Sequence, residues 1–333
     1  MTSFFARFFW THNRSNEHNM LERISLVIEN HVRHYWWWGQ PRQRSLVLFL
    51  HGTGAAVPWA DTETGWSSAA QRHGFAIALP EALPLNPRLP ANFRDNPTRW
   101  RAEDDPTTPA LISTPPGATA KPAATPSVDD PDPKVSSLYP NVDDVAFLDA
   151  VIKDIQQRLN QQVTHVFLTG FSNGAAMVFR YAAARSERLT AVAPVAGYCR
   201  CSRQQQLNRP VTTLYMIGDA DPLVPLRGGW VTSPWGNRLV QRPPVVDSLE
   251  RWAALLGCSV ISKVVEDNPE FRREVYPGPV PFHVVIVKGL GHHWPGGQGG
   301  WNSPLAGPHH ARLQATEFIW RFFEDQLIRK VNE

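Results

Sequence analysis

Continuous apolar runs alternate along the chain with segments of helical pattern, and together they predict a sheet covered by helices. Uninterrupted apolar runs are typical of parallel strands buried on both faces, and they occur at 45–50, 75–79, 166–168, 190–197, 211–217 and 283–287. Patterns that suit helices occur at 66–72, 141–159, 248–256 and 311–330. Two earlier strands, 24–29 and 32–38, are predicted to form an antiparallel pair. This alternation indicates an α/β fold with a mostly parallel central sheet.

The predicted helix at 141–159 has a polar start. Asn141 is predicted to be its N-cap, because an asparagine side chain accepts hydrogen bonds from the first free N–H groups of a helix. Asp143 and Asp144 fall in the predicted first turn, where a negative charge is favourable. Both carboxylates therefore have a structural explanation and need no catalytic one.

A proline-rich segment interrupts the pattern of strands and helices. Residues 80–140 hold fourteen of the thirty prolines, and 104–132 have almost no large apolar side chains. Such a stretch buries too little to order itself, so we predict an extended insertion at about 86–140, near the active-site face. It either covers the cleft in part or forms a plain surface loop, and Arg99 and Trp100 are the predicted anchor.

Apart from a short N-terminal extension, the whole chain is predicted to form one catalytic domain, which includes the insertion. Residues 1–20 form a predicted N-terminal extension, and residues 21–333 form the domain, because its length and composition allow one large core.

The pentapeptide Gly-Phe-Ser-Asn-Gly at 170–174 lies between an apolar run and a stretch of small, helix-favouring residues. Strand, sharp turn and helix are the context in which Gly-x-Ser-x-Gly becomes a nucleophile elbow, with the serine hydroxyl exposed at the top of the sheet. A Cβ atom at Gly170 or Gly174 is expected to collide with the neighbouring strand or helix. Ser172 is therefore the predicted nucleophile.

Candidate partners for this serine follow two later strands. A serine nucleophile needs a base within hydrogen-bond reach and a carboxylate that holds the base. Asp219 and Asp221 follow the strand at 211–217, and His292 and His293 follow the last strand. The order serine, acid, histidine is that of an α/β-hydrolase. Spacing alone does not choose within either pair.

A glycine-rich turn, His51-Gly-Thr-Gly54, ends the strand at 45–50. Turns at this end of a central strand are where open α/β sheets bind ligands. We predict an oxyanion hole formed by the backbone N–H groups of Thr53 and Asn173, although a plain tight turn is the alternative. His51 is predicted to brace the turn by hydrogen bonding, without a role in proton transfer.

Composition narrows the functional classes. The net charge of +3 and the absence of a Lys/Arg run argue against nucleic acid, and no apolar run is long enough to cross a membrane. Residues 4–10 make a poor signal peptide because Arg7 interrupts them, and the three cysteines make no disulfide framework. We expect reduced thiols in a cytoplasmic protein, with secretion left open. The sequence does not fix the oligomeric state.

The chain contains thirteen tryptophans, which suggests aromatic-walled clefts. Trp294, beside the candidate base, and Trp100 are predicted to wall an acyl or aromatic pocket, with core packing as the alternative. His309 and His310 resemble a metal pair, but no third ligand is evident and a solvated helix start is the preferred interpretation. No metal or cofactor is expected.

Four segments, 50–54, 170–177, 218–225 and 289–297, together resemble the polyhydroxybutyrate depolymerase and feruloyl esterase family of α/β-hydrolases. The resemblance spans about residues 45–325. It implies the α/β-hydrolase fold, Ser172 as nucleophile, Asp221 as acid and His292 as base. It also implies hydrolysis of hydroxyalkanoate or feruloyl and other aromatic esters, with a small or oligomeric ester as the partner.

Two alternatives have the same sequence features. A serine peptidase of the prolyl oligopeptidase type has the same order of triad residues, and a catalytically silent α/β-hydrolase fold that only binds a ligand keeps the same strands.

Overall fold

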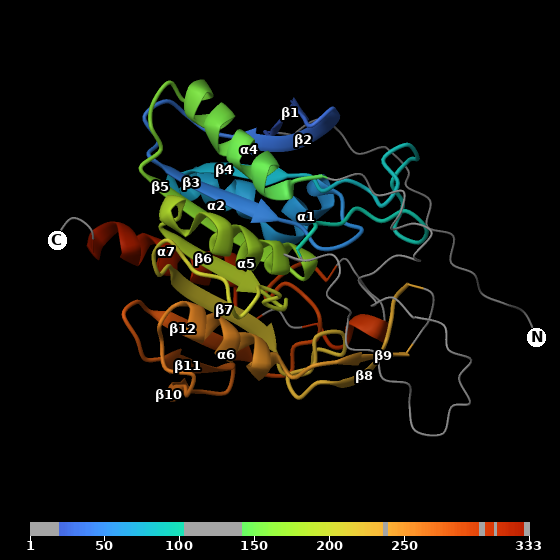
Figure 1. Cartoon of the computed structure of the whole chain (residues 1–333), viewed down its shortest axis with the longest axis vertical. Coiled ribbons are helices and arrows are strands. Elements are labelled where there is room, and N and C mark those ends of the chain that lie inside the picture. Colours follow the sequence, from blue (N-terminus) through green and yellow to red (C-terminus); the bar gives the residue numbers. More distant parts are fainter. Residues whose placement is uncertain (1–19, 103–141, 236–238, 300–303, 310–311, 330–333) are drawn as a thin grey trace, which may run out of the picture.

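The computed structural model describes residues 20–102, 142–235, 239–299, 304–309 and 312–329. Within these residues one ten-stranded sheet runs through the molecule in the order β1-β2-β4-β3-β5-β6-β7-β12-β11-β10 (Figure 1). In chain order its strands are β1 Glu22–Ile28, β2 His31–Trp38, β3 Ser45–Leu50, β4 Ala76–Pro80, β5 His165–Phe171, β6 Ala191–Val195, β7 Thr212–Gly218, β10 Lys263–Asp267, β11 Phe271–Tyr276 and β12 Phe282–Val287. A separate hairpin consists of β8 Gly229–Thr232 and β9 Leu239–Arg242.

The centre of the sheet is parallel and its two borders are antiparallel. Strands β4, β3, β5, β6, β7 and β12 pair in parallel. The antiparallel pairs are β1–β2, β2–β4, β12–β11 and β11–β10. Every residue of β4 and β6 is buried, as the apolar runs predicted. The predicted mostly parallel α/β sheet is therefore confirmed.

Helices cover both faces of the sheet (Figure 1). They are α1 Val57–Thr64, α2 Trp66–His73, α4 Asp144–Arg158, α5 Asn173–Arg185, α6 Val245–Leu255 and α7 Ala315–Arg329, with short 3-10 turns η1 Ser186–Arg188 and η2 Pro304–Ala306. Helix α4 packs on α5, and α5 packs on α6 through Phe179 and Trp252. On the other face α2 packs on α7, where Trp320 stacks on His73. The parallel strands lie between these two layers.

The predicted start of α4 is wrong by two residues. Asp143 is the N-cap, because its Oδ1 atom accepts the N–H groups of Val145 and Ala146 at 2.9 and 3.1 Å. Asn141 lies outside the described residues. Asparagine and aspartate cap helices about equally well, so the local sequence did not decide between them.

Much of the predicted N-terminal extension and insertion falls outside the described residues, which include only residue 20 of the first and 86–102 of the second. The two predicted anchor residues of the insertion, Arg99 and Trp100, are both buried. The three cysteines are buried free thiols. None of the described helices combines the length and the apolar character needed to cross a membrane.

Candidate active site

Ser172 occupies the turn between β5 and α5. Its φ of 56° and ψ of −118° are unusual for a residue with a side chain, and such strain is stored mainly at functional sites. The two glycines permit the turn: a Cβ atom on Gly174 would lie 2.1 Å from the carbonyl oxygen of Leu50, and one on Gly170 would lie 2.8 Å from the same atom. The expected collisions at both glycines are confirmed.

A continuous hydrogen-bonded chain links three residues that are far apart in the sequence. The Ser172 Oγ atom lies 2.9 Å from the His292 Nε2 atom. The Nδ1 atom of the same imidazole lies 2.7 Å from the Asp221 Oδ2 atom. A carboxylate is an acceptor only, so Nδ1 carries the proton and donates a hydrogen bond to Asp221. Nε2 then accepts the hydrogen bond of the Ser172 hydroxyl.

The structure separates the two candidates within each ambiguous pair. The second carboxylate oxygen of Asp221, Oδ1, accepts the N–H groups of Leu223 and Val224, both at 2.8 Å, and this fixes the orientation of the buried carboxylate. Asp219 instead is exposed, and it accepts the N–H of Gly289 at 2.6 Å.

The two adjacent histidines point to different partners. The Nε2 atom of His293 lies 3.1 Å from the carbonyl oxygen of Gly307, so this ring does not join the chain to Ser172. Burial and the neighbouring His292 lower the pKa of His293. The structure therefore brings Asp221 and His292 to the serine, and it directs Asp219 and His293 elsewhere.

The predicted oxyanion donors lie on two segments beside the serine. The turn from Gly52 to Ala55 is closed by a hydrogen bond from the Ala55 N–H to the Gly52 oxygen, at 3.2 Å. A Cβ atom on Gly52 would lie 3.4 Å from the Cβ atom of Ser172, so this turn is immediately next to the nucleophile. Thr53 lies within the turn. Asn173 is the first residue of α5, where backbone N–H groups have no acceptor within the helix.

His51 braces this turn, as predicted. Its Nε2 atom accepts a hydrogen bond from the Ala82 N–H at 3.1 Å, so Nδ1 carries the proton. Nδ1 donates a hydrogen bond to the Gly52 oxygen at 2.8 Å. The ring is therefore neutral and both of its nitrogens are used. Burial lowers the pKa of His51 below its ordinary value of 6.5.

Acid is expected to destabilise the fold through His51. The unfolded chain takes up a proton at this histidine below about pH 6.5, whereas the folded chain takes it up only at lower pH. The contribution of His51 to stability is therefore complete above that pH and falls as the pH decreases, by at most about 1.4 kcal/mol per pH unit for one proton. Urea unfolding between pH 7.5 and 5 measures this slope. The free energy of unfolding of His51→Gln is expected to depend less on pH than that of the natural protein. Equal pH dependence in the two proteins would contradict a lowered pKa of His51.

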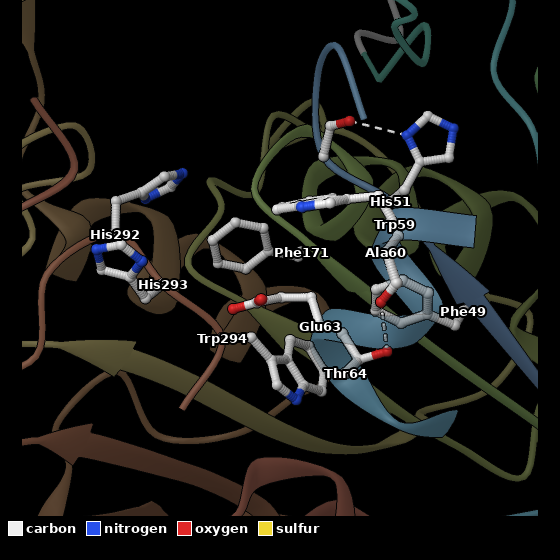
Figure 2. A pocket seen from close by; sticks show the side chains of 11 residues that line it. Phe49, His51, Trp59, Ala60, Glu63, Thr64, Phe171, His292, His293 and Trp294 are labelled. Carbon is white, nitrogen blue, oxygen red and sulfur yellow. Dashed lines mark hydrogen bonds between the residues drawn. The ribbon is translucent and has the colours of Figure 1, made fainter. Parts of the chain in front are cut away.

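An aromatic pocket of about 30 Å³ is lined in part by His292 (Figure 2). Its walls include Phe49, His51, Gly52, Trp59, Phe171, His292, His293 and Trp294, together with Ala60, Glu63 and Thr64 of α1. Trp294 is held in place because its indole N–H donates to Thr316 Oγ1 at 3.0 Å, and its ring meets Phe49 edge to face at 5.4 Å. Trp294 therefore lines a pocket, and its contact with a substrate stays a prediction.

Trp100 does not line this pocket. Its side chain is fully buried, and its indole N–H donates to the carbonyl oxygen of His51 at 2.9 Å. The predicted contact of Trp100 with a substrate is thus corrected: the tryptophan lies behind the turn, where it packs against the His51 ring at 5.5 Å. The sequence alone allowed both possibilities, since core packing and pocket walls use the same residue type.

Several pocket residues were not predicted from the sequence. Trp59 and Glu63 lie one turn apart on α1, a helix that the sequence pattern did not predict. Phe171 precedes the serine, and its place within the pentapeptide was the one signal that could have identified it. His309 and His310 resemble a metal pair in the sequence. His309 is exposed, and its Nε2 atom lies 2.7 Å from the Gly297 oxygen. His310 lies outside the described residues.

Comparison with known proteins gives relatives that are named as esterases. No family model matches the chain. A protein described as "Putative esterase NocK", from Nocardia uniformis subsp. tsuyamanensis, is 25% identical over 301 residues, which cover 83% of this chain and 73% of that protein. Feruloyl esterase C from Emericella nidulans is 36% identical over 89 residues, which cover 27% of this chain and only 33% of that protein.

Solved structures show the same fold at low sequence identity. The acetyl xylan esterase from Aspergillus awamori superposes with a TM-score of 0.50 and 12% identity, covering 82% of this chain and 94% of that one. These three proteins are named as esterases and not as polyhydroxybutyrate depolymerases, so that part of the resemblance stays a prediction. The chain has the α/β-hydrolase fold, and its relatives support a hydrolase that acts on esters.

Proposed function

We propose that the protein is a serine esterase that hydrolyses carboxylic esters through Ser172, His292 and Asp221. The observation that carries the proposal is the chain of hydrogen bonds, 2.9 and 2.7 Å long, that ends on a serine with positive φ. The similarity to an esterase over 83% of the chain supports the same reaction class.

The proposed reaction has two steps. His292 Nε2 takes the proton from Ser172 Oγ as this oxygen attacks the ester carbonyl, and Asp221 stabilises the resulting imidazolium. The N–H groups of Asn173 and Thr53 bind the oxyanion of the tetrahedral intermediate. The imidazolium then protonates the leaving alcohol, and the acyl group stays on the serine. Water, deprotonated by His292, releases the acid; no step uses a cofactor.

The substrates we propose are hydroxyalkanoate esters or feruloyl and other aromatic esters. The pocket beside His292 favours the first group, because a volume of about 30 Å³ accommodates only a few heavy atoms. A single water already needs roughly 10–15 Å³ on such a scale. A feruloyl group is larger than the space that this volume describes. We therefore propose a short acyl chain, with the larger part of the substrate on the alcohol side.

Hydrolysis of a matched set of substrates tests this proposal. The set comprises p-nitrophenyl acetate, butyrate and octanoate, methyl ferulate, hydroxybutyrate oligomers and a prolyl p-nitroanilide. We expect the acetate and butyrate to be cleaved at least about tenfold faster, in kcat/KM, than the octanoate, because each methylene that does not fit lowers transition-state binding. Turnover of the anilide in preference to every ester would favour the peptidase.

Labelling by a fluorophosphonate distinguishes an enzyme from a silent binding protein. An activated serine forms a covalent adduct with this reagent, so one label per chain is expected at Ser172, identified by peptide mass spectrometry. A chain that neither reacts with the reagent nor hydrolyses any ester of the set would contradict the proposed esterase.

A further inference from the structure

Trp100 forms hydrogen bonds to both segments on which the proposed oxyanion donors lie. Its indole N–H donates to the His51 oxygen at 2.9 Å. Its backbone N–H donates to Asn173 Oδ1 at 2.7 Å, and the Asn173 Nδ2 donates back to the Trp100 oxygen at 3.1 Å. The two segments are far apart in the sequence, and one residue joins them.

Neighbouring contacts strengthen the same junction. The Gly54 N–H donates to the Thr98 oxygen at 2.8 Å, and the Thr98 hydroxyl donates to the Ala55 oxygen at 3.0 Å. The chain around Trp100 is therefore paired with the turn both before and after Thr53. Trp100 and Asn173 are buried, and buried hydrogen bonds are stronger and more rigid than exposed ones.

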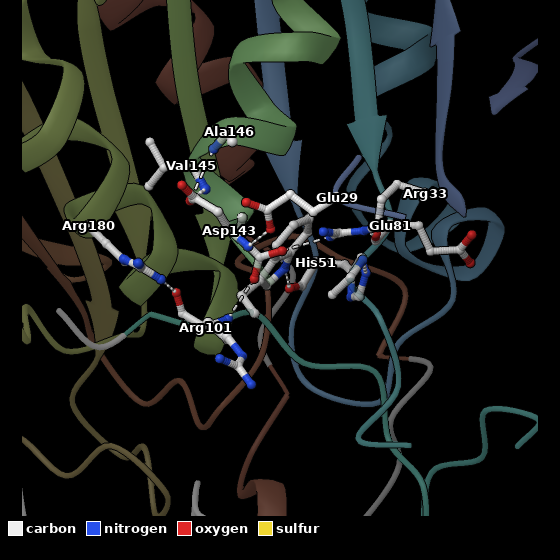
Figure 3. A network of polar contacts seen from close by, with 12 residues as sticks. Glu29, Arg33, His51, Glu81, Arg101, Asp143, Val145, Ala146 and Arg180 are labelled. Carbon is white, nitrogen blue, oxygen red and sulfur yellow. Dashed lines mark hydrogen bonds and ion pairs between the residues drawn. The ribbon is translucent and has the colours of Figure 1, made fainter. Parts of the chain in front are cut away.

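The segment that contains Trp100 is itself fixed at its other end. The Arg101 N–H donates to Asp144 Oδ2 at 2.8 Å, and Asp144 Oδ1 accepts from the fully buried Arg33 at 2.7 Å (Figure 3). Arg180 of α5 also donates to the Arg101 oxygen. The guanidinium of Arg33 lies 3.9 Å from the centre of the Phe147 ring, which holds the ion pair against α4.

We propose that Trp100 is a positioning residue that sets the separation between the N–H groups of Thr53 and Asn173. This inference rests on the proposed esterase function. Oxyanion donors act only when they lie about 2.7–3.1 Å from the oxygen that becomes charged. Thr53 lies on an irregular turn outside the strands and helices, so a fixed reference is needed to hold it against α5. The indole and the side chain of Asn173 supply that reference from one buried site.

Trp100→Phe tests the inference, because it removes the indole N–H and keeps a buried aromatic ring. Losing a whole oxyanion donor lowers kcat by roughly 10²–10³-fold, so misplacing one is expected to lower kcat for p-nitrophenyl acetate by about tenfold. KM is expected to change less than about twofold, because the donors act on the transition state rather than on the bound ester.

Trp252→Phe is the matched control. Trp252 is also fully buried, and its indole N–H donates to Thr213 Oγ1 at 3.0 Å, between α6 and β7. Both variants lose one buried indole hydrogen bond and should lose similar stability in urea. Only Trp100→Phe is expected to lose kcat. An equal kcat in the two variants, or a loss that appears only in KM, would overturn the proposal.

Binding of a short-chain trifluoromethyl ketone gives a second readout. This inhibitor forms a hemiketal oxyanion on an active serine, so its affinity should fall in Trp100→Phe by the same factor as kcat and should be unchanged in the control. If Trp100→Phe does not fold, Asn173→Ala removes the same junction from the other side and keeps the Asn173 N–H; the same loss is expected. An inactive natural protein would refute the esterase itself, whereas an active protein with unaffected variants would refute only the role of Trp100.

Discussion

Ser172→Ala is expected to lower kcat for p-nitrophenyl acetate by roughly 10⁴–10⁶-fold, the range in which loss of a serine nucleophile falls. The substitution removes a single oxygen, which lies 2.9 Å from His292 Nε2. The imidazole and the N–H groups remain in place, but no atom of the protein is left to form the acyl-enzyme. Steady-state hydrolysis and fluorophosphonate labelling should both be lost.

Ser186→Ala provides the control for this variant. Ser186 is a fully buried serine just after the last turn of α5, and its Oγ atom accepts the Arg209 N–H at 3.1 Å. It should keep kcat although it loses a buried hydrogen bond. Ser172→Ala should instead have the melting temperature of the natural protein or a higher one. The substitution changes only the side chain and leaves the strained backbone of the turn as it is. Residual turnover above one hundredth of the natural rate in Ser172→Ala would rule out this serine as nucleophile.

Asp221→Asn is expected to lower kcat by roughly 10⁴-fold, as the same change does in other Ser-His-Asp enzymes. Its physical cause is the tautomer of the histidine. An amide whose NH₂ group faces His292 Nδ1 donates a hydrogen bond where the carboxylate accepted one, so the imidazole places its proton on Nε2. Nε2 then cannot take the serine proton, and no negative charge remains to stabilise an imidazolium.

Asp219→Asn tests the same chemistry two residues earlier in the chain. This exposed carboxylate accepts the Gly289 N–H, and the amide oxygen of asparagine can accept the same bond. We expect kcat to change less than twofold. Stopped-flow measurement of acylation separates the two variants most directly. Comparable losses in both would mean that the region after β7, and not the Asp221–His292 bond, limits the reaction.

The centre of the fold could be predicted from the sequence because its strands are buried on both faces. Strands β3, β4, β6 and β7 read as uninterrupted apolar runs, and their positions agree with the prediction within a few residues. Strands β10 and β11 were not predicted. They form an antiparallel border that is rich in charged residues and contains a single buried residue, Tyr276, so neither the apolar run nor a clear alternation was present.

The sequence predicted the candidate site except for the choice between two nearby aspartates and two adjacent histidines. Asp219 and Asp221 both follow β7, and only the path of the turn decides which carboxylate reaches His292. The Leu223 and Val224 N–H groups that fix Asp221 become available only when the chain has turned. Trp100 is held by a hydrogen bond to Asn173, which is 73 residues away in the sequence. The local sequence around Trp100 therefore could not predict its position.

The bond between Arg101 and Asp144 bears on how the fold tolerates changes in chain length. These two residues border the chain from 103 to 141, and their contact joins its two ends. We therefore expect changes in the length of the chain between them to leave the start of α4 and the position of Ser172 unchanged.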